Sequence, residues 1–405
     1  MNSSHSVTAR TALYYLVIFA QALGSIFLPA ASYILKSTAH VGLSDTQYGL
    51  LYLPMIVSMI ATTAFFYRLL ERFGKWRLFL SGLGINLVFL ALVLSVSLFR
   101  LTGERAFVWL LAGNGFLGCG FGLLVSDLNL LVEDLYPSKR DAALSGLHGS
   151  LGIGASVAPL GVEFFHRTIH WGTLAAVDLC LLAVIALMVA RDRGWVPEAG
   201  NNSAAVLHRR EKVDWKKLPP AVTGFFVALI FYGIVESLMG NWSPVYLTAE
   251  KGFSPSTGAT CLALFWFSLT LGRLLASFLT IRCDARIFYR LLPFFILAGL
   301  LLLIRTEAER AIGLPYILTG FGCSAFYPLT VSLAVGYHER WRAVISSMSL
   351  GTLIFGTGIG SCVTGYLRER GIADLDRIFA MGAVCAVIMG VFAFFLTVRK
   401  IPRGV

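Results

Sequence analysis

Few side chains in this sequence could carry proton chemistry, because acids and histidines are rare within its long apolar stretches. Glu236 lies inside the apolar stretch 221–248, and Asp127 and His148 lie inside two others. A carboxylate in such surroundings costs several kcal/mol unless it is protonated, paired or hydrated. A histidine can take or give a proton near neutral pH. Glu236 is therefore the first candidate for proton exchange, followed by Asp127 and His148.

Each candidate also has a structural interpretation. Glu236 could be an acid that hydrogen-bonds a neighbouring helix, although the functional interpretation is favoured. Asp127 lies two residues beyond Val125, and two residues rotate a helix by about 200°, away from the face that carries Val125 and Asn129. Its functional and packing interpretations stay open. A lone histidine such as His148 is more often a packing residue than a proton relay, and Asp178 is interpreted as a structural acid.

A second set of polar and aromatic residues could line a cavity for a polar solute. Amides bond hydroxyl groups, and aromatic rings stack on the apolar faces of sugars. The alternative is that the amides join helices and that the rings, above all those at 242 and 246, lie at a membrane interface. The candidates are Gln21, Asn129, Asn241, Trp242, Tyr246, Trp266 and Tyr327.

The elements that position these residues are membrane-spanning helices. Of 405 residues, 57% are hydrophobic and only 14% are charged, and the mean hydropathy is +0.76. Each apolar run is long enough to cross a hydrocarbon core of about 30 Å as a helix. No barrel-like alternation occurs, and the first run is too long for a signal peptide. We predict an all-α integral membrane protein with twelve spans, at 11–35, 46–68, 77–99, 106–135, 142–165, 171–190, 221–248, 256–280, 287–304, 311–337, 343–367 and 376–398.

A polar, basic segment divides the chain near its midpoint. It predicts an N-terminal six-helix bundle at 1–190, a linker at 191–218 and a C-terminal six-helix bundle at 219–405. With the N-terminus inside, the inner segments hold 22 of the 33 Lys and Arg residues and the outer loops hold 10. This asymmetry predicts a multi-pass protein of the cell (inner or plasma) membrane with a cytoplasmic linker and both termini cytoplasmic.

The two halves repeat at an offset of about 200 residues. Gly120-Phe-Gly122 is matched by Gly320-Phe-Gly322. A basic, serine-containing start of span 5 at 140–145 is matched at 342–347, and glycine-rich faces follow both. Several matches at one offset predict a pseudo-two-fold, 6+6 arrangement.

The loop between spans 2 and 3 contains Glu71-Arg72-Phe73-Gly74-Lys75. It resembles the signature of the major facilitator superfamily at that loop, although Tyr67 replaces the leading glycine and Glu71 the usual aspartate. The resemblance covers the whole chain and implies alternating access of two helix bundles. It also implies an inner charge network that controls conformational state, for which the gating candidates are Glu71, Arg72, Gly74, Lys75, Glu133, Asp134 and Arg140.

A narrower resemblance is carried by Tyr232-Gly-Ile-Val-Glu236, Asn241-Trp242, Phe265-Trp266 and Tyr327-Pro328. These segments are similar to the fucose permease-like branch and its sodium-dependent glucose transporter relatives. The branch implies a sugar substrate and proton coupling. Two features depart from it: span 1 has no acid, and Val125 stands where proton-coupled members carry a glutamate in span 4.

The expected function is secondary transport of a small, sugar-like polar solute, with proton symport as the leading mechanism. A proton-coupled exporter of a drug or metabolite is the alternative, because Gly154 and Ala158-Pro159 partly match an antiporter motif. A membrane enzyme or receptor is disfavoured, since no nucleotide-binding or hydrolase motif has supporting context. We expect a monomer in the lipid bilayer with no cofactor, no metal ion and no nucleic acid partner, its basic residues serving topology instead.

Overall fold

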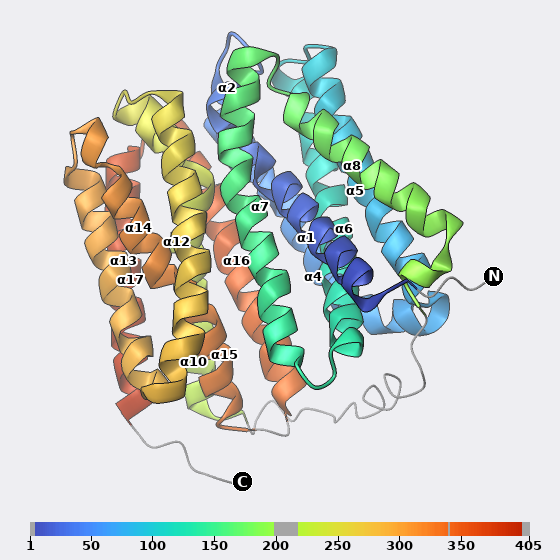
Figure 1. The fold of residues 1–405 in the computed structure, drawn as a ribbon. Helices are drawn as coiled ribbons and strands as arrows, with labels where there is room; N and C mark the ends of the chain where they lie inside the picture. Colours follow the sequence, from blue (N-terminus) through green and yellow to red (C-terminus); the bar gives the residue numbers. More distant parts are fainter. Residues whose placement is uncertain (1–4, 198–217, 339–340, 399–405) are drawn as a thin grey trace. The chain divides into compact units, whose positions relative to one another are not determined.

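The computed structural model describes residues 5–197, 218–338 and 341–398. Every regular element in these ranges is helical. The chain divides into two compact units, residues 1–210 and 211–405. Most of the predicted linker therefore lies outside the described residues. Figure 1 shows the two units in the blue-to-green and yellow-to-red parts of the ribbon.

Unit 1 contains six long helical segments. Two of them are composite: α1 is followed by α2, and α3 by α4. The bounds are α1 Val7–Ala30, α2 Ser32–Lys36, α3 Asp45–Leu50, α4 Tyr52–Phe73, α5 Lys75–Leu98, α6 Gly103–Leu135, α7 Arg140–Thr168 and α8 Thr173–Arg191, followed by the short 3₁₀ turn η1 Arg193–Trp195.

Unit 2 also contains six long segments, and two of these are interrupted. The first is α10 Pro220–Ser237, continued by the π-helix η3 Leu238–Trp242, α11 Ser243–Val245 and the π-helix η4 Tyr246–Glu250. The others are α12 Pro255–Arg282, α13 Ala285–Arg305, the 3₁₀ turn η5 Glu309–Ala311 with α14 Gly313–Ser324 and α15 Phe326–Val335, then α16 Arg342–Glu369 and α17 Leu375–Val398.

These segments confirm the twelve predicted spans. By length and apolar composition, 11 helical segments of the described chain could cross a membrane. The predicted span that is absent from these 11, residues 142–165, is the 29-residue α7. Its glycines, serines and His148 make it less apolar. The largest boundary difference is at α4, which continues to Phe73, five residues beyond the predicted 68, and ends where Gly74 adopts a φ of 78°. Only glycine adopts that left-handed conformation readily, which explains why this loop needs it.

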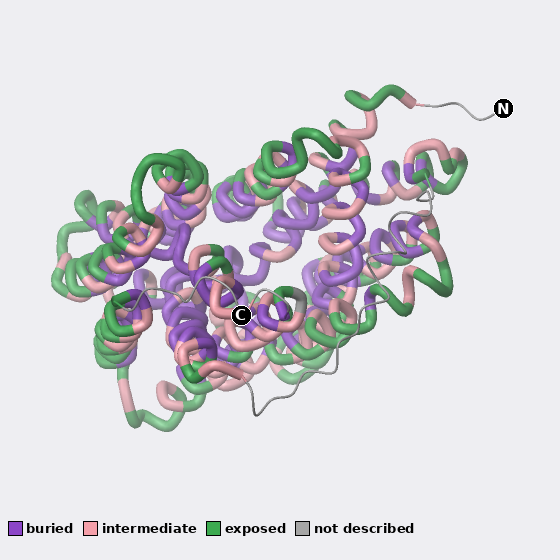
Figure 2. The backbone as a smooth tube through the Cα atoms, turned by 90° about the horizontal axis from the view of Figure 1, so that it is seen from below, coloured by how far each residue is buried: buried purple, intermediate pink, exposed green. Residues whose placement is uncertain are grey.

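Within each unit the same spans pack together, which confirms the predicted repeat. In unit 1, α1 packs on α7, α4 and α5 pack on α6, and α8 packs on α5. In unit 2, α10 packs on α16, α12 and α13 pack on α14, and α17 packs on α13. Figure 2 shows the consequence in both units, with buried positions on the helix sides that meet a neighbour and exposed positions on the others.

Glycines allow the closest of these approaches. A methyl group at Gly154 of α7 would lie 2.4 Å from the carbonyl oxygen of Phe19 in α1. At the matching position in unit 2, a methyl group at Gly356 of α16 would lie 2.2 Å from the carbonyl oxygen of Ile230 in α10. Small residues let helix backbones touch in a membrane, where burial of apolar surface supplies little driving force. The predicted glycine-rich faces are thus helix-packing surfaces.

Candidate functional site

Glu236 and Tyr232 share one face of α10, one helical turn apart. The Tyr232 hydroxyl donates to Glu236 Oε1 at 3.4 Å and to the backbone carbonyl oxygen of Cys323 at 3.1 Å. Tyr232 is fully buried and stacks on Phe326 with ring centroids 5.5 Å apart, whereas Glu236 is half-buried. The tyrosine is therefore fixed, and its single hydroxyl proton is shared between a carboxylate and a backbone acceptor.

The carbonyl that Tyr232 reaches is available because the helix of span 10 is interrupted. Helix α14 ends at Ser324 and α15 begins at Phe326, with Ala325 at φ −109° and ψ 0° between them. Pro328 has no backbone N–H, so it cannot donate to Ser324 four residues earlier. The Ser324 carbonyl therefore lacks its intrahelical donor. This carbonyl and that of Cys323, at the same interruption, accept hydrogen bonds from other helices.

Arg273 of α12 occupies the second of these carbonyls. Its Nε donates to the Ser324 oxygen at 3.0 Å. Among the described residues no ion pair within 4 Å joins Arg273 and Glu236. The two side chains instead meet adjacent backbone groups of one interrupted helix. We name Glu236, Tyr232, Arg273 and the carbonyls of Cys323 and Ser324 the Glu236 cluster.

A second irregularity lies just beyond Glu236, where the chain winds as a π-helix. Pro244 cannot donate to the Gly240 carbonyl, and single π-helical turns often mark functional positions. Asn241 in this turn donates from Nδ2 to Ser361 Oγ of α16 at 2.8 Å. The Trp266 ring packs beside Gly240, where an added methyl group would lie 3.3 Å from it.

The structure separates the seven cavity candidates into two groups. Asn129, Asn241, Trp266 and Tyr327 are all half-buried. Two of their polar atoms, Asn129 Oδ1 and Trp266 Nε1, have no hydrogen-bond partner within the described part of the chain. Because such atoms are costly when buried, they are natural contacts for a polar solute.

The other three candidates are buried. Gln21 is buried and exchanges two hydrogen bonds with Asn86 of α5, at 2.6 and 3.2 Å. Trp242 and Tyr246 are fully buried, and Tyr246 bonds Asp376 and stacks on Phe379. The described contacts of Gln21 and Tyr246 are with neighbouring helices. A cavity role for Gln21, Trp242 and Tyr246 stays a prediction. The membrane-interface alternative for the two rings likewise stays a prediction.

The remaining acids and His148 are spread over unit 1. Asp127 of α6 is fully buried, while Val125 and Asn129 are half-buried on another face, as the rotation argument predicted. His148 is exposed on α7. Asp178 of α8 is buried, and neither of its oxygens has a hydrogen-bond partner among the described residues. No single cluster within unit 1 joins these groups in the way that Glu236 is joined to Tyr232.

The gating candidates of unit 1 form two ion pairs at one end of its helices. Lys75, whose side chain is only 2% exposed, pairs with Asp134 of α6. Arg140 of α7 pairs with Glu133 at 2.5 Å. Glu71 and Arg72 are exposed at the end of α4, where the Arg72 guanidinium lies over the Phe73 ring. The structure thus joins α5, α6 and α7 through charges and leaves Glu71 outside these pairs.

We expect Asp134→Asn to lower the free energy of unfolding by about 1–2 kcal/mol, because a charge-assisted bond to the buried Lys75 is lost. The half-exposed carboxylate keeps the effect below that of a fully buried pair. Thermal unfolding in detergent measures it. Glu71→Gln is the matched control and should leave the melting temperature unchanged. Equal melting temperatures for the wild type and Asp134→Asn would refute a stabilising role for the pair.

Three residues of these sites escaped the sequence analysis. Asn86 carried no signal, because its partner Gln21 lies 65 residues away. The carbonyls of Cys323 and Ser324 are backbone groups and have no residue type of their own. Pro328, four residues after Ser324 within an apolar span, is the signal that could have indicated an interrupted helix there.

Polar residues near the C-terminal end of α7 form hydrogen bonds with one another and with side chains of neighbouring helices. Glu163 accepts from the Tyr33 hydroxyl at 2.6 Å and from Arg167 Nε at 2.5 Å, and His170 Nδ1 lies 2.9 Å from Ser97 Oγ. Across the described residues, no group of three or more His, Cys, Asp or Glu side chains is arranged to hold a metal ion.

Two characterised relatives show what the chain is similar to. It is 23% identical over 395 residues to the cis,cis-muconate transport protein of Acinetobacter baylyi, covering 89% of both chains. It is also 23% identical over 324 residues to the glucose/mannose transporter of Bacillus subtilis, covering 75% of this chain and 76% of that one.

Solved structures share the fold. A bacterial homologue of the human lysosomal transporter Spinster, inward-facing and occupied, superposes with a TM-score of 0.72 at 16% identity over 96% of each chain. The Escherichia coli fucose:proton symporter superposes with a TM-score of 0.59 at 16% identity, covering 98% of this chain and 100% of that one. The model of the Major Facilitator Superfamily matches residues 13–337. Twelve helical segments, a repeated packing pattern within each unit and this match over most of the chain establish that the protein belongs to the Major Facilitator Superfamily of membrane transporters.

Proposed function

We propose that this transporter carries a small polar, sugar-like solute together with a proton, as a monomer, and that Glu236 binds the proton. The observation that carries the proposal is the Glu236 cluster. A carboxylate of an apolar span shares the proton of a buried tyrosine hydroxyl, which also bonds the interruption of span 10. Interrupted helices commonly form the binding sites of secondary transporters.

Protonation of Glu236 would change which bonds Tyr232 can make. When the carboxylate is ionised, it can only accept, so it competes with the Cys323 carbonyl for the tyrosine proton. When it is protonated, its O–H can donate to the tyrosine oxygen, and the tyrosine proton is released to the Cys323 carbonyl. The proton would thereby strengthen the bond between α10 and the break in span 10. This links proton binding to the packing of an element that could move during transport.

The half-buried amides and rings supply contacts for the solute. In unit 2, Asn241, Trp266 and Tyr327 lie on the interrupted or adjacent helices, with Trp266 beside the π-helical turn. An amide can both donate to and accept from a hydroxyl group, and an indole ring can stack on the apolar face of a sugar. The glucose/mannose relative and the fucose:proton symporter support a sugar and a proton, respectively.

A second candidate function is export or uptake of a carboxylate-bearing metabolite. The muconate relative supports an acidic solute. Arg273 is a half-buried cation in the Glu236 cluster, and one of its nitrogens already bonds a backbone carbonyl. A guanidinium held in that way can receive a carboxylate through its remaining nitrogens. An antiporter would use the same proton site in exchange, with solute and proton moving in opposite directions.

Purified protein in liposomes separates these possibilities. An inward proton gradient should drive uptake of a sugar, and this uptake should acidify the liposome interior. Addition of solute without a gradient should likewise move protons inward. Solute-driven proton efflux would instead identify exchange. A prior ligand-stability screen over sugars, carboxylates, nucleosides and drugs chooses the solute. Absence of any solute-dependent proton movement would overturn proton coupling altogether.

We further propose that residues 191–218 link the two bundles on the cytoplasmic side, with both termini on that side. The charge asymmetry of the loops supports this orientation. A cysteine introduced by Ser203→Cys in a variant that lacks accessible cysteines should resist a membrane-impermeant maleimide in intact cells and react after permeabilisation. Efficient labelling in intact cells would reverse the proposed topology.

A further inference from the structure

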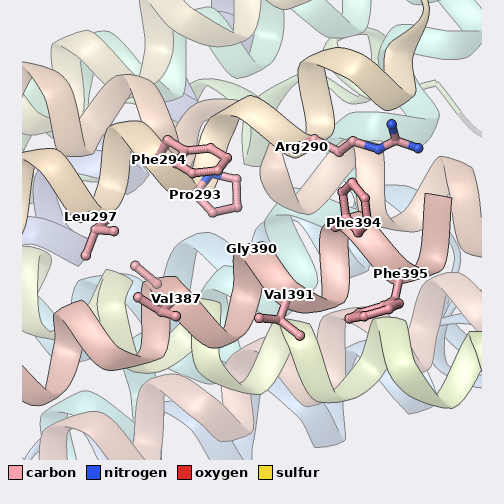
Figure 3. Close-up of a pocket in the computed structure, with 10 residues that line it drawn as sticks. Arg290, Pro293, Phe294, Leu297, Val387, Gly390, Val391, Phe394 and Phe395 are labelled. Carbon is pink, nitrogen blue, oxygen red and sulfur yellow. The ribbon is translucent and has the colours of Figure 1, made fainter. Parts of the chain in front are cut away.

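An apolar groove runs between α13 and α17 on the surface of unit 2. It has a volume of about 350 Å³. Figure 3 shows its lining, with Arg290 and Phe394 at one end and Leu297 and Val387 at the other. We name it the α13–α17 groove. Nothing in the proposed transport cycle uses it, because the Glu236 cluster involves α10, α12 and the break between α14 and α15.

The sequence of each helix makes the groove. Positions 294 and 297 of α13 and positions 387, 391 and 394 of α17 recur at helical spacing, so each helix presents an apolar stripe. Arg290 lies one turn before position 294 on the same face of α13. Pro293 interrupts the backbone hydrogen bonding of α13. Gly390 of α17 faces it without a side chain, and a methyl group there would lie 3.6 Å from the Pro293 ring. A missing side chain opposite a proline leaves the hollow between the helices.

One end of the groove carries a cation without a counter-charge. The Arg290 Nε donates to Thr397 Oγ1 at 2.6 Å, and its guanidinium lies 5.4 Å from the centre of the Phe394 ring. Among the residues that the structure describes, no carboxylate lies within 4 Å of Arg290, and its two terminal nitrogens have no hydrogen-bond acceptor. Arg286, one turn earlier, is on the same face of α13 and adds a second positive charge near that end.

We propose that the α13–α17 groove binds an anionic phospholipid, with an acyl chain along the groove and the headgroup phosphate on Arg290. The chain is a multi-pass membrane protein, and the exposed side chains of Phe294, Val391 and Phe395 place this groove on its apolar outer surface. The solvent of such a surface is lipid. A guanidinium with two free terminal nitrogens at the end of an apolar groove complements a phosphate joined to a hydrocarbon tail.

The test compares lipids by native mass spectrometry and by thermal unfolding in nanodiscs. Phosphatidylglycerol should remain bound to the wild type and should raise its melting temperature above that in phosphatidylcholine alone. Arg290→Gln should weaken phosphatidylglycerol binding about fivefold, since one interfacial arginine contributes about 1 kcal/mol. Arg305→Gln changes an exposed arginine at the opposite end of the same helix. It is the matched control and should bind phosphatidylglycerol like the wild type.

A second variant tests the tail. Gly390→Leu fills the groove and should reduce binding of long-chain phosphatidylglycerol while the melting temperature in phosphatidylcholine shows that the protein is folded. Equal phosphatidylglycerol binding by the wild type and Arg290→Gln would overturn the proposal. So would equal losses in Arg290→Gln and Arg305→Gln, which would indicate general surface charge. Displacement of the lipid by inorganic phosphate at equal concentration would identify an anion site without a lipid groove.

Discussion

Glu236→Gln should abolish proton-driven accumulation of the solute and leave solute binding intact. Glutamine has the shape of a protonated glutamate, and its amide can donate to the Tyr232 oxygen as the protonated acid would. The bond from Tyr232 to the Cys323 carbonyl would then persist in every state. The variant is expected to behave as a permanently protonated carrier that can exchange solute but cannot release a proton.

The expected effect has a natural scale. For one proton per solute, a pH difference of one unit can drive a solute gradient of at most about tenfold. Wild-type liposomes should approach that value, while Glu236→Gln liposomes should reach equal concentrations on both sides. Counterflow exchange measured at two pH values should be retained by the variant and should lose its pH dependence.

Tyr232→Phe and Asp178→Asn provide matched comparisons. Tyr232→Phe keeps the stacked ring but removes the shared hydroxyl, so it should weaken coupling without removing the carboxylate. Asp178→Asn changes a buried acid of unit 1 and should leave coupling unchanged. If Glu236→Gln still concentrates solute on a pH gradient alone, Glu236 is not the proton carrier, and Asp127 and His148 become the next candidates.

Gly233→Ala should destabilise unit 2 strongly even though alanine is the better helix former. A methyl group at Gly233 of α10 would lie 2.2 Å from the Leu353 carbonyl oxygen and 2.7 Å from the Thr357 amide nitrogen, both in the backbone of α16. Both atoms belong to the backbone of α16 and cannot move aside by rotation of a side chain, so α10 and α16 must separate. We expect a loss of about 3 kcal/mol, the upper end of the range for overpacked cores.

Gly351→Ala is the control for this effect. A methyl group there meets no atom within 4 Å. On helix propensity alone, each replacement should stabilise by about 0.5–1 kcal/mol. Opposite signs of the melting-temperature change in the two variants therefore isolate the contact between α10 and α16. A Gly233→Ala protein as stable as the wild type would show that this close approach is absent in the membrane.

Much of the fold could be predicted because a bilayer demands long apolar helices, and these are visible in composition. Glu236 was found in the same way, since a carboxylate stands out in an apolar span. Its neighbour Tyr232 follows from helical periodicity. The partners across helices could not be found, because Gln21 with Asn86, Tyr232 with Cys323, and Lys75 with Asp134 depend on how spans dock.

Burial separated the cavity candidates where residue type could not. Trp242 and Trp266 are the same residue within adjacent spans, but one is fully buried and the other half-buried beside the π-helical turn. The difference depends on the local winding around Gly240 and Pro244. Periodicity assumes a regular helix, so it misplaces side chains wherever the helix is irregular.

The break between α14 and α15 affects which hydrogen bonds mutagenesis of this transporter can detect. Tyr232 and Arg273 hold the peptide groups of Cys323 and Ser324, which every amino acid possesses. Replacing Cys323 or Ser324 by alanine leaves both backbone acceptors in place, so an alanine scan would show no loss of these two hydrogen bonds. The Ser324 carbonyl lacks its intrahelical donor because of Pro328, four residues later, whose side chain takes part in neither hydrogen bond. A phenotype of a Pro328 variant would therefore report on hydrogen bonds that are made about one helical turn earlier in the chain.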